Sequence, residues 1–215
     1  MLYSRTSREI VRKIVNLFSY TDLSKLDKSQ KDQLVELHKK SLPDTPFSML
    51  DVIMCTKIYD FVASSRGFFN SVAVFNGQPI GLCVGKTSHS TKKVVFSKKI
   101  YLSYIKEVIV RRKIFFYRDF IQLMILIFIK NQKSKQFWIE LIFVDESFKN
   151  LKIGSSLLSQ YINIVPHTRE IWVDTKKTNT GAACFYLKHN FKEIEIPLLD
   201  SYLFVRKGSY ESFAN

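Results

Sequence analysis

The spacing of apolar and polar residues predicts several helices and one short strand in the N-terminal third of this chain. Three segments have apolar residues at helical spacing: 7–19, 29–41 and 45–65. Ser29 is the expected N-cap of the second helix, and Pro43 is expected to stop it. Thr45 followed by Pro46 is a typical start for the third. Between the first two helices, residues 23–26 are expected to form a short first strand.

Further along the chain, apolar runs separated by turn residues predict a sheet. Residues 69–75 and Gln78–Lys86 are expected to form a hairpin, because Asn76-Gly77 between them favours a tight turn. The remaining strands are expected at Phe137–Val144, 170–175 and 197–206, separated by helices at about 154–163 and 179–189.

The long segment 87–136 interrupts this alternation of strands and helices. It begins rich in Ser, Thr and Lys, and from about residue 100 to 130 it becomes apolar, aromatic and basic, which predicts one or two helices. Its longest apolar patch, residues 121–129, is far too short to span a bilayer and contains Gln122.

Two short segments near the C-terminus are the candidates for chemistry: residues 148–158 and residues 179–191. The first follows the apolar run Phe137–Val144, passes through a basic loop and enters a helix near Gly154. A junction of this kind directs backbone N–H groups and a partial positive charge towards whatever lies in front of it. It is therefore suited to bind an anion such as a pyrophosphate.

These two segments resemble the GNAT superfamily of N-acyltransferases, whose cofactor is acetyl-CoA. Four residues fall on the family's pyrophosphate loop: Phe148 at the aromatic place, Lys149 at the basic one, Lys152 at the first glycine and Gly154 at the second. Six more match the later signature at fixed spacing: Asn179, Ala182, Phe185, Tyr186, Lys188 and Phe191. Asn190 replaces a glycine there, a mild departure because asparagine tolerates the left-handed conformation that closes helices. Lys152 is the larger departure, since its side chain could crowd the phosphates or add a charge to them.

The resemblance implies a fold of the α/β (α+β) class. This GNAT fold has a mixed central sheet splayed between strands 4 and 5, helices on both faces, and here a helical insertion between strands 3 and 4. It also implies that acetyl-CoA lays its pantetheine arm along strand 4 and its pyrophosphate on the loop. The residues so implied in cofactor binding are Ile142, Phe143, Val144, Lys149, Asn150, Leu151, Lys152, Ile153, Gly154, Ser155, Asn179 and Phe185. Phe185 also fits an ordinary place in the helix core.

Acetyl transfer to an amine needs a polarised thioester carbonyl, a base for the ammonium and an acid for the departing thiolate. The resemblance implies that Tyr186 is the acid, and that a main-chain N–H of strand 4 polarises the carbonyl. Glu140 is the candidate base, because it is the lone carboxylate of an apolar strand, where desolvation would raise its pKa. A structural tyrosine, and an exposed or ion-paired glutamate, explain the same residues. Asp174 and His189 are weaker candidates, and His189 is expected at a helix end.

Composition bounds the possible partners. With 215 residues, 46% of them hydrophobic and 24% charged, the chain is expected to form a single globular domain, 1–215, with residues 1–28 as an N-terminal extension. The net charge of +14 and the pI near 9.7 favour anionic partners, although solvated surface lysines explain these values equally well.

An odd number of separated cysteines suits buried reduced thiols: Cys55, Cys83 and Cys184. The four histidines lack ligand spacing, so no metal is expected: His38, His89, His167 and His189.

Because no signal peptide or transmembrane segment is recognised, a cytoplasmic protein is expected. The leading hypothesis is an N-acetyltransferase acting on a primary amine of a small molecule. An amino sugar, with a nucleotide-linked form included, is favoured because the pattern Leu37-His38…Leu42-Pro43 and the helix-rich insertion resemble GNAT proteins of bacterial surface-polysaccharide pathways. A peptide or protein amine is the nearest alternative.

The second hypothesis is a GNAT-shaped module with little catalysis that binds nucleic acid or an anionic membrane. The aromatic and basic run 111–118 motivates it, but a packed helix explains the same run. Nucleic acid is therefore not the expected partner, peripheral membrane contact stays open, and so does the oligomeric state, a dimer included.

Overall fold

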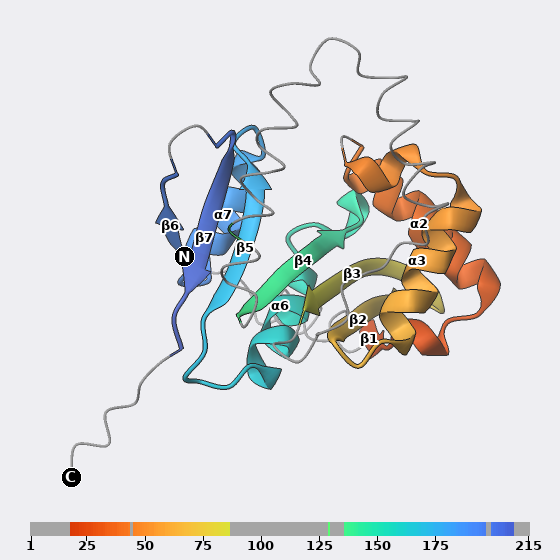
Figure 1. Ribbon diagram of the computed structural model, residues 1–215. Helices are drawn as coiled ribbons and strands as arrows, with labels where there is room; N and C mark the ends of the chain where they lie inside the picture. Colours follow the sequence, from red (N-terminus) through yellow and green to blue (C-terminus); the bar gives the residue numbers. More distant parts are fainter. Residues whose placement is uncertain (1–17, 44, 87–128, 130–135, 197–198, 209–215) are drawn as a thin grey trace, which may run out of the picture. The chain divides into compact units, whose positions relative to one another are not determined.

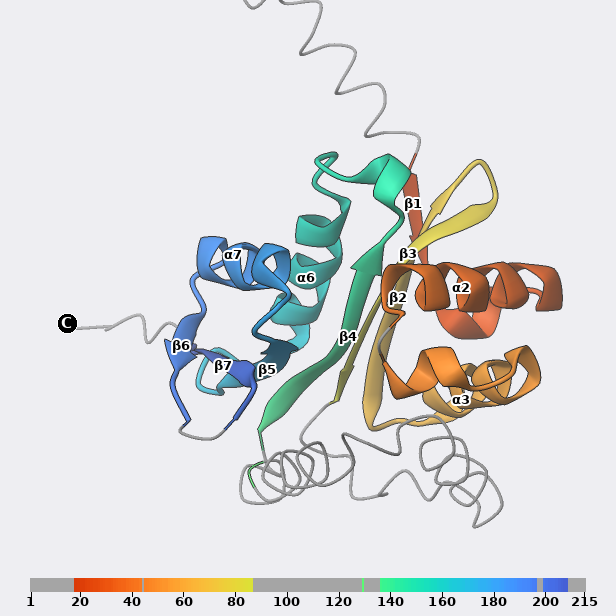
Figure 2. The ribbon, with the colours of Figure 1, turned by 90° about the horizontal axis from the view of Figure 1, so that it is seen from above.

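The computed structural model describes residues 18–43, 45–86, 129, 136–196 and 199–208, and Figures 1 and 2 show the elements from two directions. Most of the helix predicted at 7–19 and most of the insertion 87–136 lie outside these residues. The helices are η1 (Leu23–Lys25), α2 (Lys28–Ser41), η2 (Pro46–Met49), α3 (Val52–Ser64), η3 (Glu146–Phe148), α6 (Ile153–Ile164) and α7 (Thr180–Lys188), where η marks a 3-10 helix. The strands are β1 (Phe18–Thr21), β2 (Phe68–Phe75), β3 (Gln78–Lys86), β4 (Phe137–Val144), β5 (Ile171–Lys176), β6 (Lys192–Ile194) and β7 (Ser201–Arg206).

The described strands are hydrogen-bonded in the order β1-β2-β3-β4-β5-β7-β6. Parallel pairing joins β4 to β5, whereas β1–β2, β5–β7 and β6–β7 are antiparallel. The β2–β3 hairpin turns through Asn76 (φ 50°) and Gly77 (φ 78°), both in the left-handed region that this kind of tight turn requires. The mixed sheet predicted from the sequence is confirmed.

The chain divides into two compact units whose segments alternate along the sequence. Unit 1 takes its described residues from 1–65, 70–84 and 141–160, and unit 2 from 66–69, 85–140 and 161–215. Strand β4 contributes its last four residues to unit 1 and its first four to unit 2. The single domain predicted from the sequence stays a prediction.

In unit 1, α2 and α3 cover one face of β2 and β3, and α6 lies on the opposite face (Figure 2). Helix α2 is capped by Asp27, not by Ser29 as predicted, because Asp27 and Gln30 form a reciprocal capping box. The helix predicted over 45–65 is interrupted: η2 ends at Met49, and Asp51 caps α3 by accepting the Met54 N–H at 2.7 Å.

The first strand lies earlier than predicted. Residues 18–21 pair with β2, whereas the segment expected to be extended forms η1 instead. The N–H of Leu23 donates to Asn70 Oδ1 at 2.7 Å, which anchors η1 against β2. Residues 18–25 thus pair and pack with β2, and the assignment of residues 1–28 to an N-terminal extension stays a prediction. A local pattern could not show this, because the partners of this segment are distant in sequence.

Unit 2 is built on the antiparallel ladders of β7 with β5 and with β6. Its core includes a cluster of Trp138, Trp172, Leu203 and Val205, against which Ile129, Ile194 and Ile196 pack. The short strand β6 was not predicted, and β7 begins at Ser201 instead of residue 197.

The three cysteines are free thiols. Cys55 and Cys83 are buried, as predicted, and burial raises the pKa of each to about 12. Cys184 is exposed on α7, so the prediction of a buried thiol is wrong there; the buried residues of this helix are its neighbours Ala183 and Tyr186. Among the described residues, no helix is both long and apolar enough to cross a membrane.

Candidate active site

The predicted phosphate loop lies in unit 1 and is held at its start by three contacts. The carboxylate of Asp145 accepts the Ser147 N–H at 2.9 Å and caps η3. The ring of Phe148 then packs on Phe75, with ring centroids 5.3 Å apart, and on Phe18, at 6.1 Å and nearly perpendicular. The aromatic residue of the motif thus anchors the loop to β1 and β2. Sequence reasoning missed Phe18, which it assigned to a helix.

The loop then enters α6 through two residues in left-handed conformations, Asn150 (φ 67°) and Lys152 (φ 62°). The Ser156 N–H donates to the Lys152 carbonyl oxygen at 2.9 Å, which is the first bond of the helix ladder. The amides of Ile153 and Gly154 precede that bond, so the helix itself offers them no acceptor. The buried side chain of Ile153 fixes this turn. The arrangement is a backbone site for an anion at a helix N-terminus.

The charges around this loop differ in their surroundings. Lys149 forms an ion pair with Glu146, and both side chains are more than half exposed. Lys152 is exposed, and no carboxylate pairs with it in the described part of the chain. The backbone of Lys152 is left-handed, a conformation that glycine adopts readily. That its side chain crowds the phosphates or adds a charge to them stays a prediction.

The last part of β4, which holds the predicted pantetheine contacts Ile142, Phe143 and Val144, packs closely on β3. The Asp145 N–H donates to the Ile80 carbonyl oxygen at 2.8 Å, and a Cβ on Gly81 would lie 2.9 Å from the Phe143 oxygen. The parallel register with β5, in contrast, covers only Phe137 to Ile139. Pairing with β5 is thus limited to the beginning of β4, as a splayed pair requires.

A buried polar pair lies against the ring of Phe143. His38 Nδ1 and the Tyr59 hydroxyl are 2.7 Å apart, and both side chains are buried. The imidazole stacks on Phe47 at 3.9 Å and lies 5.0 Å from the Phe143 ring. Burial lowers the pKa of His38 to about 3, so the ring is neutral at physiological pH. Sequence reasoning did not find this pair, because its members share no motif.

Helix α7 in unit 2 carries the second motif. Asn179 is its N-cap, and its Oδ1 accepts the Ala182 N–H at 3.1 Å. The Oδ1 of Asn179 thus already caps α7, and the contact of Asn179 with the cofactor stays a prediction. Phe185 is half-buried, with its ring 4.7 Å from that of His189, so the alternative of a helix-core residue holds in part.

Tyr186 is buried, with its ring 5.4 Å from Phe191 and 5.8 Å from Phe204. Backbone hydrogen bonds close the helix after Tyr186. The Phe191 N–H donates to the carbonyl oxygen of Tyr186, and the Asn190 N–H donates to the carbonyl oxygen of Leu187, both at 3.1 Å. With Asn190 at φ 64°, this is a Schellman motif. The prediction that asparagine replaces glycine in the left-handed conformation is confirmed.

His189 is the C-cap of α7, as predicted. Its pKa is lowered by partial burial and by the positive charges of Lys188 and Arg206. The weaker candidate Asp174 is half-buried on β5, opposite Leu203.

Glu140 lies in unit 2 on β4, directly after the three buried residues Phe137 to Ile139. Its side chain is exposed, so the prediction of a desolvated carboxylate is wrong. The first three residues of β4 are buried, but none of the described residues covers Glu140 in the same way. The role of Glu140 as a base stays a prediction that no longer rests on burial.

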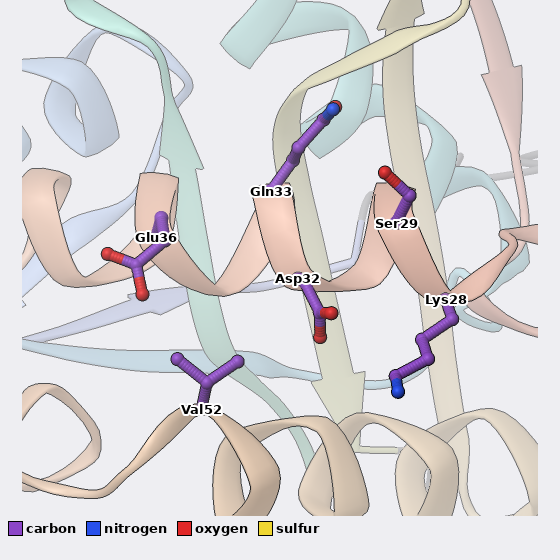
Figure 3. A pocket seen from close by; sticks show the side chains of 6 residues that line it. All are labelled: Lys28, Ser29, Asp32, Gln33, Glu36 and Val52. Atoms are coloured by element: carbon purple, nitrogen blue, oxygen red, sulfur yellow. The ribbon is translucent and has the colours of Figure 1, made fainter.

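A pocket of about 770 Å³ lies elsewhere in unit 1, along α2 and the start of α3 (Figure 3). Its lining residues are Lys28, Ser29, Asp32, Gln33, Glu36 and Val52. It contains none of the predicted site residues and is a surface hollow, so we assign it no role. Among the described residues, no group of three or more His, Cys, Asp or Glu side chains could hold a metal ion.

Comparison with known proteins agrees with this geometry. Residues 117–191 match the Acetyltransferase (GNAT) family, a segment that includes β4, the loop, α6 and α7. No curated protein matches the sequence. The matched segment and the shared fold make this chain similar to GNAT acetyltransferases.

Several solved structures share the fold at low sequence identity. An acetyltransferase from Thermus thermophilus has a TM-score of 0.55 and 9% identity, over 88% of this chain and 96% of that one. NAA60 of Arabidopsis thaliana, in complex with a bisubstrate analogue, has a TM-score of 0.54 and 14% identity, over 89% and 99%. The same protein in complex with acetyl-CoA has a TM-score of 0.52 and 15% identity, over 88% and 97%.

Proposed function

We propose that this chain is an acetyl-CoA-dependent N-acetyltransferase that moves an acetyl group to a primary amine of a small molecule by direct attack in a ternary complex. The observation that carries the proposal is the entry to α6: Asn150 and Lys152 are left-handed there, and the amides of Ile153 and Gly154 precede the first hydrogen bond of the helix. This entry lies inside the segment that matches the acetyltransferase family.

The donor fits the residues present. Residues 149–155 would hold the diphosphate, mainly through backbone N–H groups, because such groups at a helix start attract anions. The main chain of Ile142, Phe143 and Val144 would bind the pantetheine arm, and Asn179 and Phe185 would contact the donor from α7. The donor supplies an acetyl group already activated as a thioester.

Tyr186 is proposed as the general acid that protonates the departing thiolate. Its ring packs against the rings of Phe191 and Phe204, which restricts the positions that its hydroxyl can take. Such fixed placement is what proton transfer requires. Glu140, exposed on β4, is proposed as the base, acting on the ammonium through water, as a carboxylate in contact with solvent can do.

For the acceptor we favour an amino sugar, with a nucleotide-linked form included. The net charge of +14 supports an anionic acceptor, because a positive surface raises the local concentration of anions. A peptide or protein amine is the rival. Since acetyl-CoA is a cytoplasmic metabolite, we infer a cytoplasmic location.

The first test is thermal unfolding of the full chain with and without acetyl-CoA. A ligand that binds only the folded state raises Tm, by an amount that corresponds to about 2.7 kcal/mol at one hundred times its Kd. Thiol release with a panel of amino sugars, nucleotide-linked amino sugars and short peptides then identifies the acceptor. Absence of both the Tm shift and thiol release would refute the proposed activity.

A further inference from the structure

His38, near the end of α2, is a buried polar residue that the proposed mechanism does not use. Its side chain is 3% exposed, and its ring stacks on that of Phe47, with centroids 3.9 Å apart. Its Nδ1 lies 2.7 Å from the Tyr59 hydroxyl. The other ring nitrogen, Nε2, has no hydrogen-bond partner among the residues that the structure describes. Buried polar groups are nearly always hydrogen-bonded, so this nitrogen calls for an explanation.

Nε2 of His38 can be reached from outside the protein. In the described part of the chain, Gln136 Oε1 is the fully enclosed side-chain polar atom that lacks a hydrogen bond. Nε2 also lacks one but is not enclosed in that way, so the small exposed part of His38 includes this atom. Phe47, which stacks on the ring, is itself only half-buried. A small molecule can therefore supply the partner that Nε2 lacks.

The contact with Tyr59 determines which ring nitrogen carries the proton. If the buried Tyr59 hydroxyl donates to Nδ1, its proton is satisfied, whereas the reverse bond would leave a buried O–H without an acceptor. Burial raises the pKa of Tyr59 well above its ordinary value and lowers the pKa of His38 to about 3, so both groups are neutral at physiological pH. The proton of the neutral ring then lies on Nε2, which makes Nε2 an uncharged hydrogen-bond donor.

The ring of Phe143 places this donor over one face of β4. Its centroid is 5.0 Å from that of His38, and side chains project from the faces of a sheet, whereas main-chain groups project along its edges. A thioester carbonyl that accepts a main-chain N–H lies close to the plane of the sheet, so an amine must attack it from above or below that plane. A group beside the Phe143 side chain is thus placed to meet the acceptor and not the donor.

We propose that His38 donates a hydrogen bond from Nε2 to an uncharged hydroxyl or carbonyl oxygen next to the reacting amine, and so selects acceptors that carry such an oxygen. Tyr59 is the positioning residue, because its hydroxyl keeps the proton off Nδ1. This inference rests on the proposed function, since the acceptor is the amine that receives the acetyl group. An uncharged donor gains little from a phosphate or carboxylate, so it recognises the sugar or amide part of the acceptor.

The first test measures acetylation of four amines by the full chain. Glucosamine has a hydroxyl oxygen and glycinamide a carbonyl oxygen next to the amine, and cyclohexylamine and propylamine are the matching amines without oxygen. His38→Asn keeps an amide at the distance of Nδ1 from the main chain but has no atom at the place of Nε2. It should raise KM for the better oxygen-bearing amine about three- to tenfold, with kcat and KM for acetyl-CoA nearly unchanged. KM for the oxygen-free amines should stay as in the wild type.

Three further variants separate recognition from structural support. His38→Gln has an amide N–H at the distance of Nε2 and should recover most of the wild-type KM. Tyr59→Phe should raise KM for the same amine, because the imidazole proton is then free to move to Nδ1. His167→Asn, at an exposed histidine, is the matched control and should leave every KM unchanged.

A second measurement needs no variant. Nuclear magnetic resonance of wild-type protein with isotope-labelled histidine shows which ring nitrogen carries the proton. We expect it on Nε2 of His38, and we expect its resonance to shift when the better oxygen-bearing amine is added with CoA but not when the matching oxygen-free amine is added. A proton on Nδ1 overturns the inference, since Nε2 could then not donate.

The kinetic outcomes distinguish this inference from the proposed function. If the wild type releases thiol but His38→Asn leaves KM unchanged, or raises it equally for amines with and without oxygen, the role of His38 is overturned and the acetyltransferase proposal stands. A preferred acceptor without a hydroxyl or carbonyl oxygen has the same consequence. If no amine of the wider panel releases thiol from acetyl-CoA, the proposed function fails and this inference fails with it.

Discussion

The ring of Phe148 meets that of Phe18 edge-on, with centroids 6.1 Å apart and an interplanar angle of 84°. Phe18 belongs to β1 and Phe148 closes η3, so this contact joins the first described strand to the candidate phosphate loop. A residue that would otherwise belong to an N-terminal extension thereby supports the loop expected to bind the donor.

Replacing Phe148 tests this support. Phe148→Ala should lower the free energy of unfolding by about 1–3 kcal/mol, since a half-buried ring loses its apolar contacts with Phe18 and Phe75. Urea unfolding measures the loss, and the Tm shift with acetyl-CoA should shrink as well. Phe148→Leu keeps apolar bulk and should lose less; equal losses for the two variants would contradict a role for the aromatic contacts.

Tyr186 provides a test of the catalytic assignment. Tyr186→Phe should lower kcat by about a hundredfold or more, as expected on removing a general acid, while the Tm shift with acetyl-CoA remains. Tyr202→Phe is the matched control, because Tyr202 also packs near Phe204 but has no proposed role. An unchanged kcat for Tyr186→Phe would show that the hydroxyl is structural.

His38 predicts how stability depends on pH. Its folded-state pKa of about 3 lies below the ordinary value of 6.5, so below pH 6.5 the unfolded chain binds a proton that the folded chain does not. Burial of the neutral imidazole therefore costs no free energy of unfolding above pH 6.5. As pH falls from 6.5 towards 3, protonation of His38 in the unfolded chain lowers the free energy of unfolding. The loss between pH 7 and pH 5 should be about 2 kcal/mol.

Urea unfolding at the two pH values measures this effect. His38→Phe should remove most of the pH dependence, even if its stability at pH 7 is lower because the Tyr59 hydroxyl has lost its partner. His167→Gln, at an exposed histidine, should keep the dependence of the wild type. A wild type equally stable at pH 7 and pH 5 would contradict a buried neutral His38.

Gly85 tests the packing at the beginning of β4. The Tyr161 hydroxyl lies 2.7 Å from the Lys86 carbonyl oxygen and 3.0 Å from that of Trp138, and a Cβ on Gly85 would collide with the Tyr161 ring. Gly85→Ala should therefore destabilise the protein by about 2 kcal/mol or more. Tyr161→Phe, which removes only the hydroxyl, should cost about 1 kcal/mol. Thermal unfolding compares them; a harmless Gly85→Ala would mean that α6 can shift.

Where strong local signals exist, the sequence predicted the structure well. The Asn76-Gly77 turn, the bounds of β4 and the left-handed residue Asn190 after α7 all follow from residues adjacent in the chain. The cap of α2 could also have been found, since Asp27 precedes Gln30 at the spacing of a capping box. Ser29 is also a good cap residue, and propensity alone does not rank the two.

Other features had no local signal. The exposure of Glu140 depends on which elements cover β4, and an apolar strand with one carboxylate fits a buried and an exposed position equally well. The contact of His38 with Tyr59 joins two helices, so no spacing within either helix indicates it.

The order of most strands and helices, and the two motifs that resemble those of the GNAT superfamily, can be predicted from the amino-acid sequence, because turn residues, caps and apolar periodicity act over a few neighbouring positions. The contact of Phe18 with the phosphate loop, the exposure of Glu140 and the ion pair of Lys149 with Glu146 are seen only in the folded chain. Burial and charge pairing depend on segments far apart in the chain, and their energies are set only when those segments pack together.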